Sequence, residues 1–111
     1  MKWISLADLG QLHNIAVPQS DKISLIFKHS TRCSVSRMAL KQFENEFNIA
    51  DDKIDAYFLD LLNYRAVSNE ISTQFNVEHQ SPQLLVFKNG KVIHVASHSD
   101  IDATDLNKFT N

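Results

Sequence analysis

The chain has 111 residues, of which 43% are hydrophobic and 22% charged, and its formal net charge at pH 7 is -2. This composition excludes a disordered tail and predicts one globular domain over residues 1–111. The small negative charge, with no run of Lys and Arg, gives no electrostatic reason to expect nucleic acid or an anionic membrane as a partner.

Cys33 is the one cysteine of the sequence. It cannot form an internal disulfide or a cysteine-rich zinc site. The five histidines are scattered without paired helical spacing, so no metal site is predicted. The N-terminal stretch contains Asp8 and does not resemble a signal peptide, and no apolar run approaches the roughly 20 residues of a membrane span. We therefore expect a cytoplasmic protein in a reducing compartment.

The first predicted element is a short helix. Ser5 and Asp8 have the spacing of a capping box, and Leu6, Leu9 and Leu12 recur every three residues. Residues 18–21 would end this helix. The stretch "KISLIFKH" (22–29) follows and predicts a strand covered on both faces, because its middle is almost entirely apolar.

Helices and strands then alternate. A helix of about 14 residues is predicted after residue 33 from an apolar stripe, which consists of Val35, Ala39, Phe43 and Phe47, widened by Met38 and Leu40. The segment "KIDAYFLDL" (53–61) predicts a second internal strand, and "RAVSNEISTQF" (65–75) predicts a helix. This alternation favours a mostly parallel sheet wrapped by helices.

A hairpin and a last helix complete the chain. The strands "QLLVF" (83–87) and "KVIHVA" (91–96) flank Asn89-Gly90, the strongest short-range hairpin signal. Residues 99–109 predict a final helix, with Ser99 and Asp102 at capping-box spacing. The predicted fold class is α/β, with a central mixed sheet of about four strands flanked by helices and a C-terminal hairpin plus helix. This layout resembles a thioredoxin-like domain, although other small α/β sandwiches share it.

Cys33 lies where a buried strand gives way to an amphipathic helix. The unpaired N–H groups and the positive end of the helix dipole favour a thiolate there, and Arg32, Lys28 and His29 are close in sequence. The alternative is a structural cysteine in the core, the ordinary state of a free cysteine. Polar neighbours on both sides favour a reactive thiol over a core cysteine. These neighbours are Ser30, Thr31, Arg32, Ser34 and Ser36.

Cys33 and Ser36 form a C-x-x-S motif, the spacing of a dithiol redox motif with the second sulfur replaced by oxygen. A hydroxyl cannot resolve a mixed disulfide, so an outside thiol would have to release any adduct. Ser36 either donates a hydrogen bond to the thiolate or is an exposed serine of the first helical turn. His29, near the end of the strand, is a candidate modulator of the thiol.

Ser81-Pro82 precedes the hairpin. Thioredoxin-like proteins place a cis-proline at this point beside the active cysteine, and the backbone of the preceding residue contacts the bound peptide or thiol. The order of the predicted elements puts Ser81-Pro82 at this position.

The sequence resembles the monothiol bacilliredoxins of the YtxJ-like family. Four stretches carry the resemblance, and they are "FKHSTRCSVS" (27–36), "YFLDLLNYRAVSNEI" (57–71), "SPQLLVFKNGKVI" (81–93) and "ASHSDI" (96–101). Members typically read S-T-x-C-P-[IV]-S around the thiol, so Cys33 matches the nucleophile and Ser36 the serine. Ser34 stands in place of the usual proline, a departure that bears on the rigidity of the turn and on the preferred thiol.

The resemblance implies removal of a bacillithiol cap from oxidised cytosolic proteins. Cys33 would attack the bacillithiol sulfur and take over the cap, and a second bacillithiol molecule or a disulfide reductase would clear it. The partners are then S-thiolated client proteins and a small thiol, which acts as co-substrate with no bound cofactor. Two alternatives stay open: a thioredoxin-like interaction module without catalysis, and a redox enzyme that uses glutathione or another small thiol.

Overall fold

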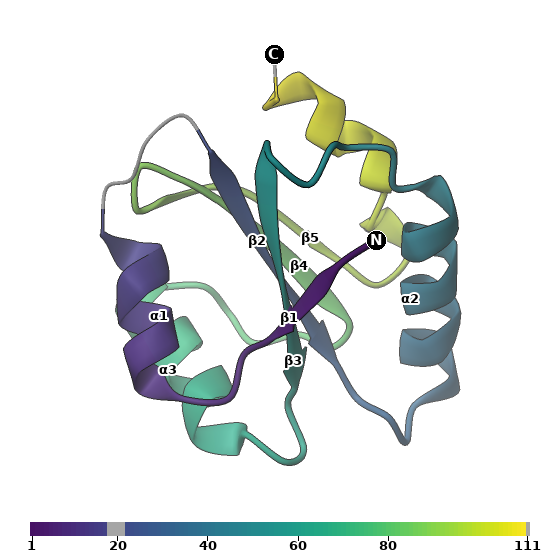
Figure 1. Cartoon of the computed structure of the whole chain (residues 1–111). Coiled ribbons are helices and arrows are strands. Elements are labelled where there is room, and N and C mark those ends of the chain that lie inside the picture. Colours follow the sequence, from purple (N-terminus) through teal and green to yellow (C-terminus); the bar gives the residue numbers. More distant parts are fainter. Residues whose placement is uncertain (18–21, 111) are drawn as a thin grey trace.

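The computed structural model describes residues 1–17 and 22–110, and it shows a mixed sheet between two helical layers (Figure 1). The strands are β1 (Trp3–Ser5), β2 (Ile23–His29), β3 (Ile54–Asp60), β4 (Gln83–Lys88) and β5 (Lys91–Ser97), in the spatial order β1-β3-β2-β4-β5. The three strands β1, β3 and β2 run parallel, whereas β4 pairs antiparallel with both β2 and β5.

Each face of the sheet is covered by its own helices. The helices are α1 (Leu9–Ala16), α2 (Ser34–Glu46), α3 (Arg65–Phe75) and two 3-10 helices, η1 (His98–Asp100) and η2 (Ala103–Lys108). In Figure 1, α1 and α3 lie on one side of the sheet, and α2 and the C-terminal 3-10 helices lie on the other. Two apolar clusters fill these layers, one under each set of helices. Among the described residues, no helix has the length and apolar character needed to cross a membrane.

Strand β2 is the middle strand of the sheet. All seven of its residues are buried, which confirms the prediction of a strand covered on both faces. Its side chains alternate, so Ile26 lies in the cluster beneath α1 and α3, and Phe27 lies in the cluster beneath α2. The chain leaves β2 at His29, and α2 begins five residues later.

The hairpin prediction is also confirmed. Lys88 pairs with Lys91 across a two-residue turn, and both Asn89 and Gly90 have positive φ values, 54° and 77°. Two positive φ values in succession characterise the type I′ turn, which suits the right-handed twist of a hairpin. A Cβ atom at Gly90 would overlap the carbonyl of Ala16, so the turn also packs closely against the end of α1.

The N-terminal prediction was wrong in two respects. Residues 3–5 form the edge strand β1, so the sheet has five strands rather than about four. The first helix begins after Asp8, whose side chain accepts from the Gln11 N–H at 2.8 Å while the Gln11 side chain binds the Asp8 N–H. The capping box is therefore Asp8–Gln11 and not Ser5–Asp8. The predicted end of the first helix, at residues 18–21, lies outside the described residues.

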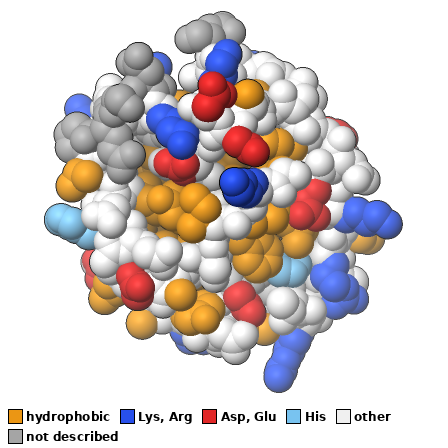
Figure 2. Space-filling model, in the orientation of Figure 1, with side chains coloured by type: hydrophobic (Ala, Val, Ile, Leu, Met, Phe, Trp, Pro, Cys, Tyr) orange, Lys and Arg blue, Asp and Glu red, His pale blue; other side chains and the backbone are white. Residues whose placement is uncertain are grey.

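The edge strand is short and mixed in character. Figure 2, which views the molecule from the side of β1, shows hydrophobic side chains between charged ones on this face. Ile4 of β1 is 38% exposed, and Lys2 precedes the strand. Short edge strands with adjacent lysines discourage pairing with a second chain.

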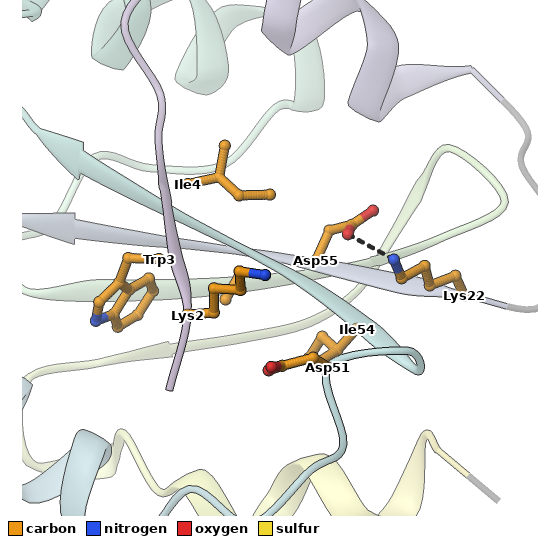
Figure 3. Close-up of a pocket in the computed structure, with 8 residues that line it drawn as sticks. Lys2, Trp3, Ile4, Lys22, Asp51, Ile54 and Asp55 are labelled. Carbon is orange, nitrogen blue, oxygen red and sulfur yellow. Dashed lines mark ion pairs between the residues drawn. The ribbon is translucent and has the colours of Figure 1, made fainter.

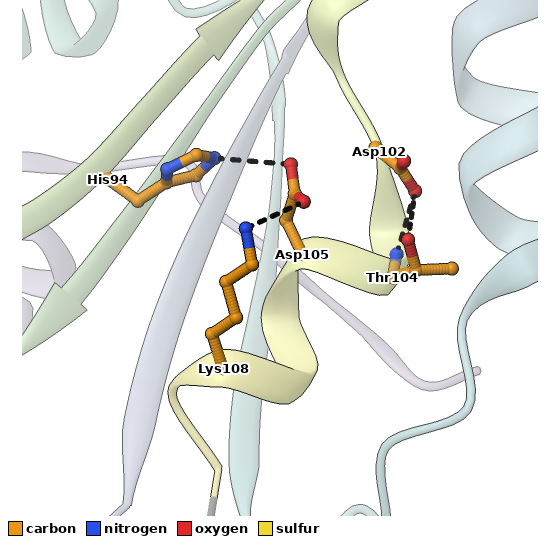
Figure 4. A network of polar contacts seen from close by, with 5 residues as sticks. All are labelled: His94, Asp102, Thr104, Asp105 and Lys108. Atoms are coloured by element: carbon orange, nitrogen blue, oxygen red, sulfur yellow. Dashed lines mark hydrogen bonds and ion pairs between the residues drawn. The ribbon is translucent and has the colours of Figure 1, made fainter.

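The C-terminal helix was predicted as one helix from residue 99 and is instead two short 3-10 helices. Ala103, Leu106 and Phe109 recur every three residues, which matches the three residues per turn of a 3-10 helix. Asp102 caps η2 by accepting from the Thr104 N–H at 2.9 Å and the Thr104 hydroxyl at 2.7 Å, so the predicted Ser99–Asp102 box is wrong (Figure 4).

Figure 4 also shows how η2 docks on the sheet. The Asp105 carboxylate lies 3.5 Å from the Lys108 ammonium and 3.9 Å from Nε2 of His94 on β5. The rings of Phe109 and His94 are in tilted contact, with centroids 5.5 Å apart. These contacts hold the end of the chain against β5.

Candidate functional site

Cys33 is the N-cap residue of α2, at the end of the sheet where β2 terminates. It is a free cysteine of intermediate exposure, which contradicts the alternative of a fully buried core residue. Its backbone N–H donates to the Ser30 carbonyl at 3.2 Å and its carbonyl accepts from the Arg37 N–H at 3.1 Å. The thiol therefore starts the helix, where the N–H groups of the first turn lack intrahelical acceptors.

The local charge around this helix start is positive. The first turn of α2 contains no acidic residue, and Arg32 is exposed directly before Cys33. Helix N-termini stabilise negative charge within their first turn, and the charge that would form here is the thiolate. Ser34 and Thr31, on either side of Arg32 and Cys33, are both exposed.

Arg37 is a residue of this turn that sequence reasoning missed. Its Nη1 donates to the Thr31 carbonyl at 3.0 Å, so the arginine ties the turn before Cys33 to the helix after it. The signal in the sequence was the spacing of Cys33 and Arg37, four residues and about one helical turn apart.

Ser36 lies inside the protein with 0% exposure, so the alternative of an exposed first-turn serine is wrong. Its Oγ accepts from the Ser30 N–H at 3.1 Å and lies 2.8 Å from Nδ1 of His29. Because the Ser30 N–H can only donate, the hydroxyl hydrogen of Ser36 is available for Nδ1 of a neutral His29. In this arrangement the serine stabilises the turn rather than the sulfur of Cys33.

His29 is the last residue of β2 and is 4% exposed. Its ring packs at 5.4 Å from that of Phe58, and burial lowers its pKa, opposed in part by the charge of Asp60. The contacts of His29 run to Ser36 and Phe58. No contact of its ring with Cys33 is found among the described residues.

Ser81 and Pro82 lie at the same end of the sheet as Cys33. Their peptide bond is cis. The register that pairs Lys28 with Gln83 puts the buried Pro82 level with His29. The Pro82 carbonyl accepts from the His98 N–H at 3.0 Å, and His98 has a positive φ of 54°.

Lys28 does not contribute to the surface around Cys33. The side chain is fully buried and, by alternation along β2, lies on the α1–α3 face of the sheet with Ile26. This position could not be found from the sequence, because the partners of Lys28 are 40 and 51 residues away along the chain.

A separate hollow of about 280 Å³ lies beside β1 (Figure 3). Lys22 and Asp55 form an ion pair of 2.8 Å along its wall. The hollow includes Ile54, the first residue of β3, whereas Cys33 follows the last residue of the parallel strand β2. The hollow is thus at the opposite end of the sheet from the thiol.

The titratable side chains offer no metal site in the part of the chain that the structure describes. Within residues 1–17 and 22–110, no three His, Cys, Asp or Glu side chains lie together in a way that could hold a metal ion.

A family model and several solved structures are consistent with this geometry. The model of the family "Monothiol bacilliredoxin BrxC" matches residues 4–106. A solved structure described as a candidate oxidoreductase with a thioredoxin fold superimposes with a TM-score of 0.80 at 28% identity, over 98% of this chain and 94% of that chain.

Two thioredoxins show the same fold at lower identity. That of Malassezia sympodialis has a TM-score of 0.69 at 22% identity, over 94% of this chain and 84% of its own. That of Fasciola hepatica has a TM-score of 0.64 at 17% identity, over 97% of this chain and 94% of its own. The chain has the thioredoxin fold and belongs to the monothiol bacilliredoxin family.

Proposed function

We propose that this protein is a thiol-disulfide oxidoreductase that removes bacillithiol, or a similar small thiol, from mixed disulfides on client proteins. The observation that carries the proposal is Cys33, a free and partly exposed cysteine at the N-cap of α2 in a chain without a second cysteine. The family match supports the same chemistry.

The reaction is an exchange of sulfur partners. The Cys33 thiolate attacks the small-thiol sulfur of the mixed disulfide, a new sulfur–sulfur bond forms to Cys33, and the client sulfur leaves with the electron pair of the broken bond. The client thiolate then takes a proton from solvent. The number of disulfides is unchanged, because the cap has moved from the client to Cys33.

An outside thiol has to restore the enzyme. Ser36 cannot resolve the adduct, because it carries oxygen in place of sulfur and its hydroxyl is engaged with His29 and Ser30. A second small thiolate would attack the adduct, leave as a symmetrical disulfide and release the Cys33 thiolate. A disulfide reductase could serve as a partner in the same step.

The groups around the thiol have separate roles in this proposal. Arg32 and the first turn of α2 stabilise the thiolate, while Thr31 and Ser34 form its exposed rim. Ser81 and Pro82 contact the client or the small thiol through the backbone. We further propose a cytoplasmic location, where cysteines are kept reduced.

The test is transfer of a defined cap. A client protein with one cysteine, capped with bacillithiol, is mixed with a slight excess of the reduced protein, and intact mass is followed for both chains. We expect the client to lose the cap and Cys33 to gain it. Cys33→Ser should leave the client capped, and Ser24→Ala, at the far end of β2, should behave like the wild type.

Other results would point to other functions. Binding of the capped client without loss of the cap would contradict the exchange reaction and favour an interaction module. Equal or faster release of a glutathione cap would keep the oxidoreductase chemistry and reject the specificity for bacillithiol.

A further inference from the structure

Lys28 is a buried lysine on the face of the sheet opposite α2. Its side chain is 0% exposed, although it belongs to β2 only one residue before the strand ends. Its Nζ lies 3.4 Å from the carbonyl of Ser68 on α3 and 3.4 Å from Nδ1 of His79. The lysine thus joins the central strand to α3 and to the segment that follows α3.

Stability alone does not explain a lysine at this position. None of the ion pairs formed within residues 1–17 and 22–110 includes Lys28, so no carboxylate compensates for the burial of its charge. Burial lowers the pKa of Lys28 to about 8. An apolar side chain of similar length would avoid this desolvation cost.

The contact of Lys28 with His79 reaches the segment that carries Ser81 and Pro82. Residues 77–82 have no regular secondary structure and connect α3 to β4. Gln83 pairs with Lys28 across β2 and β4, and its Nε2 donates to the Glu78 carbonyl at 3.0 Å. Lys28 and Gln83 therefore hold two consecutive residues of the segment, His79 and Glu78, from neighbouring strands.

At the C-terminal end of the segment, the hydrogen bond between Pro82 and His98 depends on the position of the segment. The Pro82 carbonyl accepts from the His98 N–H at 3.0 Å, which fixes the segment against the start of η1. A movement of residues 79–82 would lengthen this bond. The amide of His98 is therefore a direct probe of where Ser81 and Pro82 lie.

We propose that Lys28 is a positioning residue, which fixes the segment 77–82 through its contacts with Ser68 and His79 and so sets where Ser81 and Pro82 meet a client beside Cys33. The effect on clients rests on the proposed function, whereas the effect on the segment does not. Lys28 acts through the backbone of this segment and takes no part in the sulfur exchange.

The first test uses Lys28→Met, which keeps the length of the side chain and removes its donors. We expect the midpoint of urea unfolding to stay the same or rise, because an unpaired buried cation is lost. Hydrogen exchange of the His98 amide should be at least about fivefold faster, and removal of the client cap should be slower by a similar factor. Alkylation of Cys33 by iodoacetamide should be unchanged, because Cys33 starts α2, which covers the other face of the sheet. If Lys28 had a purely structural role, its loss would destabilise the protein. A Lys28→Met variant that is at least as stable as the wild type but removes the client cap more slowly would therefore contradict a purely structural role.

The controls separate this inference from the proposed function. Ser24→Ala changes a buried polar residue of the same strand and face, four residues from Lys28, and should leave both rates at the wild-type values. His79→Leu removes the second partner at an exposed position, so it serves if Lys28→Met does not fold. If the His98 amide of the folded Lys28 variant exchanges its hydrogen at the wild-type rate, Lys28 does not position the segment, even if the client reaction is slower. A wild-type protein that fails to remove the cap would overturn the proposed function, and the exchange measurement would still decide the role of Lys28.

Discussion

The Ser36 hydroxyl joins the end of β2 to the first turn of α2. It is fully buried and serves both the Ser30 N–H and the His29 ring. A buried hydroxyl with two partners is costly to remove, because both partners lose a hydrogen bond and the buried His29 ring has little access to water. This makes Ser36 a structural residue of the turn that presents Cys33.

We predict that Ser36→Ala lowers the free energy of unfolding by about 1–3 kcal/mol, since it removes the partner of the buried His29 ring and of the part-buried Ser30 N–H. Ser34→Ala, at an exposed position of the same turn, should change it by less than about 0.5 kcal/mol. Urea unfolding followed by circular dichroism measures both values. Equal effects of the two substitutions would contradict the assigned role of Ser36.

His29 makes the stability of the fold sensitive to mild acid. Burial lowers its pKa in the folded state below the value of about 6.5 in the unfolded chain. Between these two values the unfolded chain binds more protons than the folded one, so the free energy of unfolding falls as the pH falls. This contribution is complete above about pH 7.5 and is lost below about 6.5, as the pH falls toward the folded pKa.

We predict that His29→Gln reduces the pH dependence of stability between pH 7.5 and 5.5. The wild type should lose more free energy of unfolding over this interval than the variant does, and the excess should not surpass about 1.4 kcal/mol per pH unit, the limit for one proton. Urea unfolding at the two pH values measures the difference. Parallel pH profiles would show that His29 is not buried in its neutral form.

Capping decides where the first helix starts. The sequence offers two overlapping boxes, because Ser5 and Asp8 have the same spacing as Asp8 and Gln11. The structure uses the second, since residues 3–5 pair with β3 and their backbone is extended. Leu12 and Ile15 are then buried, and Leu9 is 50% exposed.

We predict that Asp8→Ala lowers the free energy of unfolding by about 0.5–2 kcal/mol, the usual effect of losing an N-cap side chain. Ser5→Ala should have a much smaller effect, because the Gln11 side chain binds the backbone carbonyl of Ser5 and not its hydroxyl. Thermal or urea unfolding of both variants provides the comparison. A larger loss for Ser5→Ala would favour the box that starts at Ser5.

Elements with strong local signals were predictable from sequence, and those that depend on distant partners were not. Strand β2, helix α3 and the Asn89-Gly90 hairpin each carry a periodicity or a turn signal of their own. The three residues of β1 have no such signal, and their conformation depends on pairing with residues 56–58.

The buried face of the helix after Cys33 also depends on distant partners and was predicted only in part. Its start and length were close to prediction, but Val35 is 54% and Met38 is 73% exposed, so they do not belong to the buried stripe. Ser36 and Phe43 are its buried positions, and a buried serine cannot be found from hydrophobic periodicity. The position of Cys33 at the helix start was predictable, whereas the contacts of Ser36 and Lys28 depend on the packed sheet.

At the scale of the whole molecule, Trp3 connects the edge strand to both the central strand and α2. Its ring lies 6.0 Å from those of Phe27 and Phe43 and 5.6 Å from that of Phe58. Its Nε1 donates to the Glu44 carboxylate at 2.8 Å. The N-terminal strand is therefore packed into the aromatic core on the α2 side of the sheet.

We predict that this edge strand unfolds together with the rest of the molecule. Trp3 is the single tryptophan, so its fluorescence reports on β1, while far-ultraviolet circular dichroism reports on all helices and strands. Separation of β1 would expose Trp3 and part of Phe27 and Phe43, which costs about 25 cal/mol for each Å² of apolar surface. The two urea transitions should therefore coincide, as expected for a two-state domain of this size.

Trp3→Phe should lower the midpoint of the dichroism transition, because it removes the hydrogen bond to Glu44 and part of the buried apolar area. A fluorescence transition at lower urea than the dichroism transition would instead show that β1 opens separately, and the sheet would then behave as a stable four-stranded unit with a labile fifth strand.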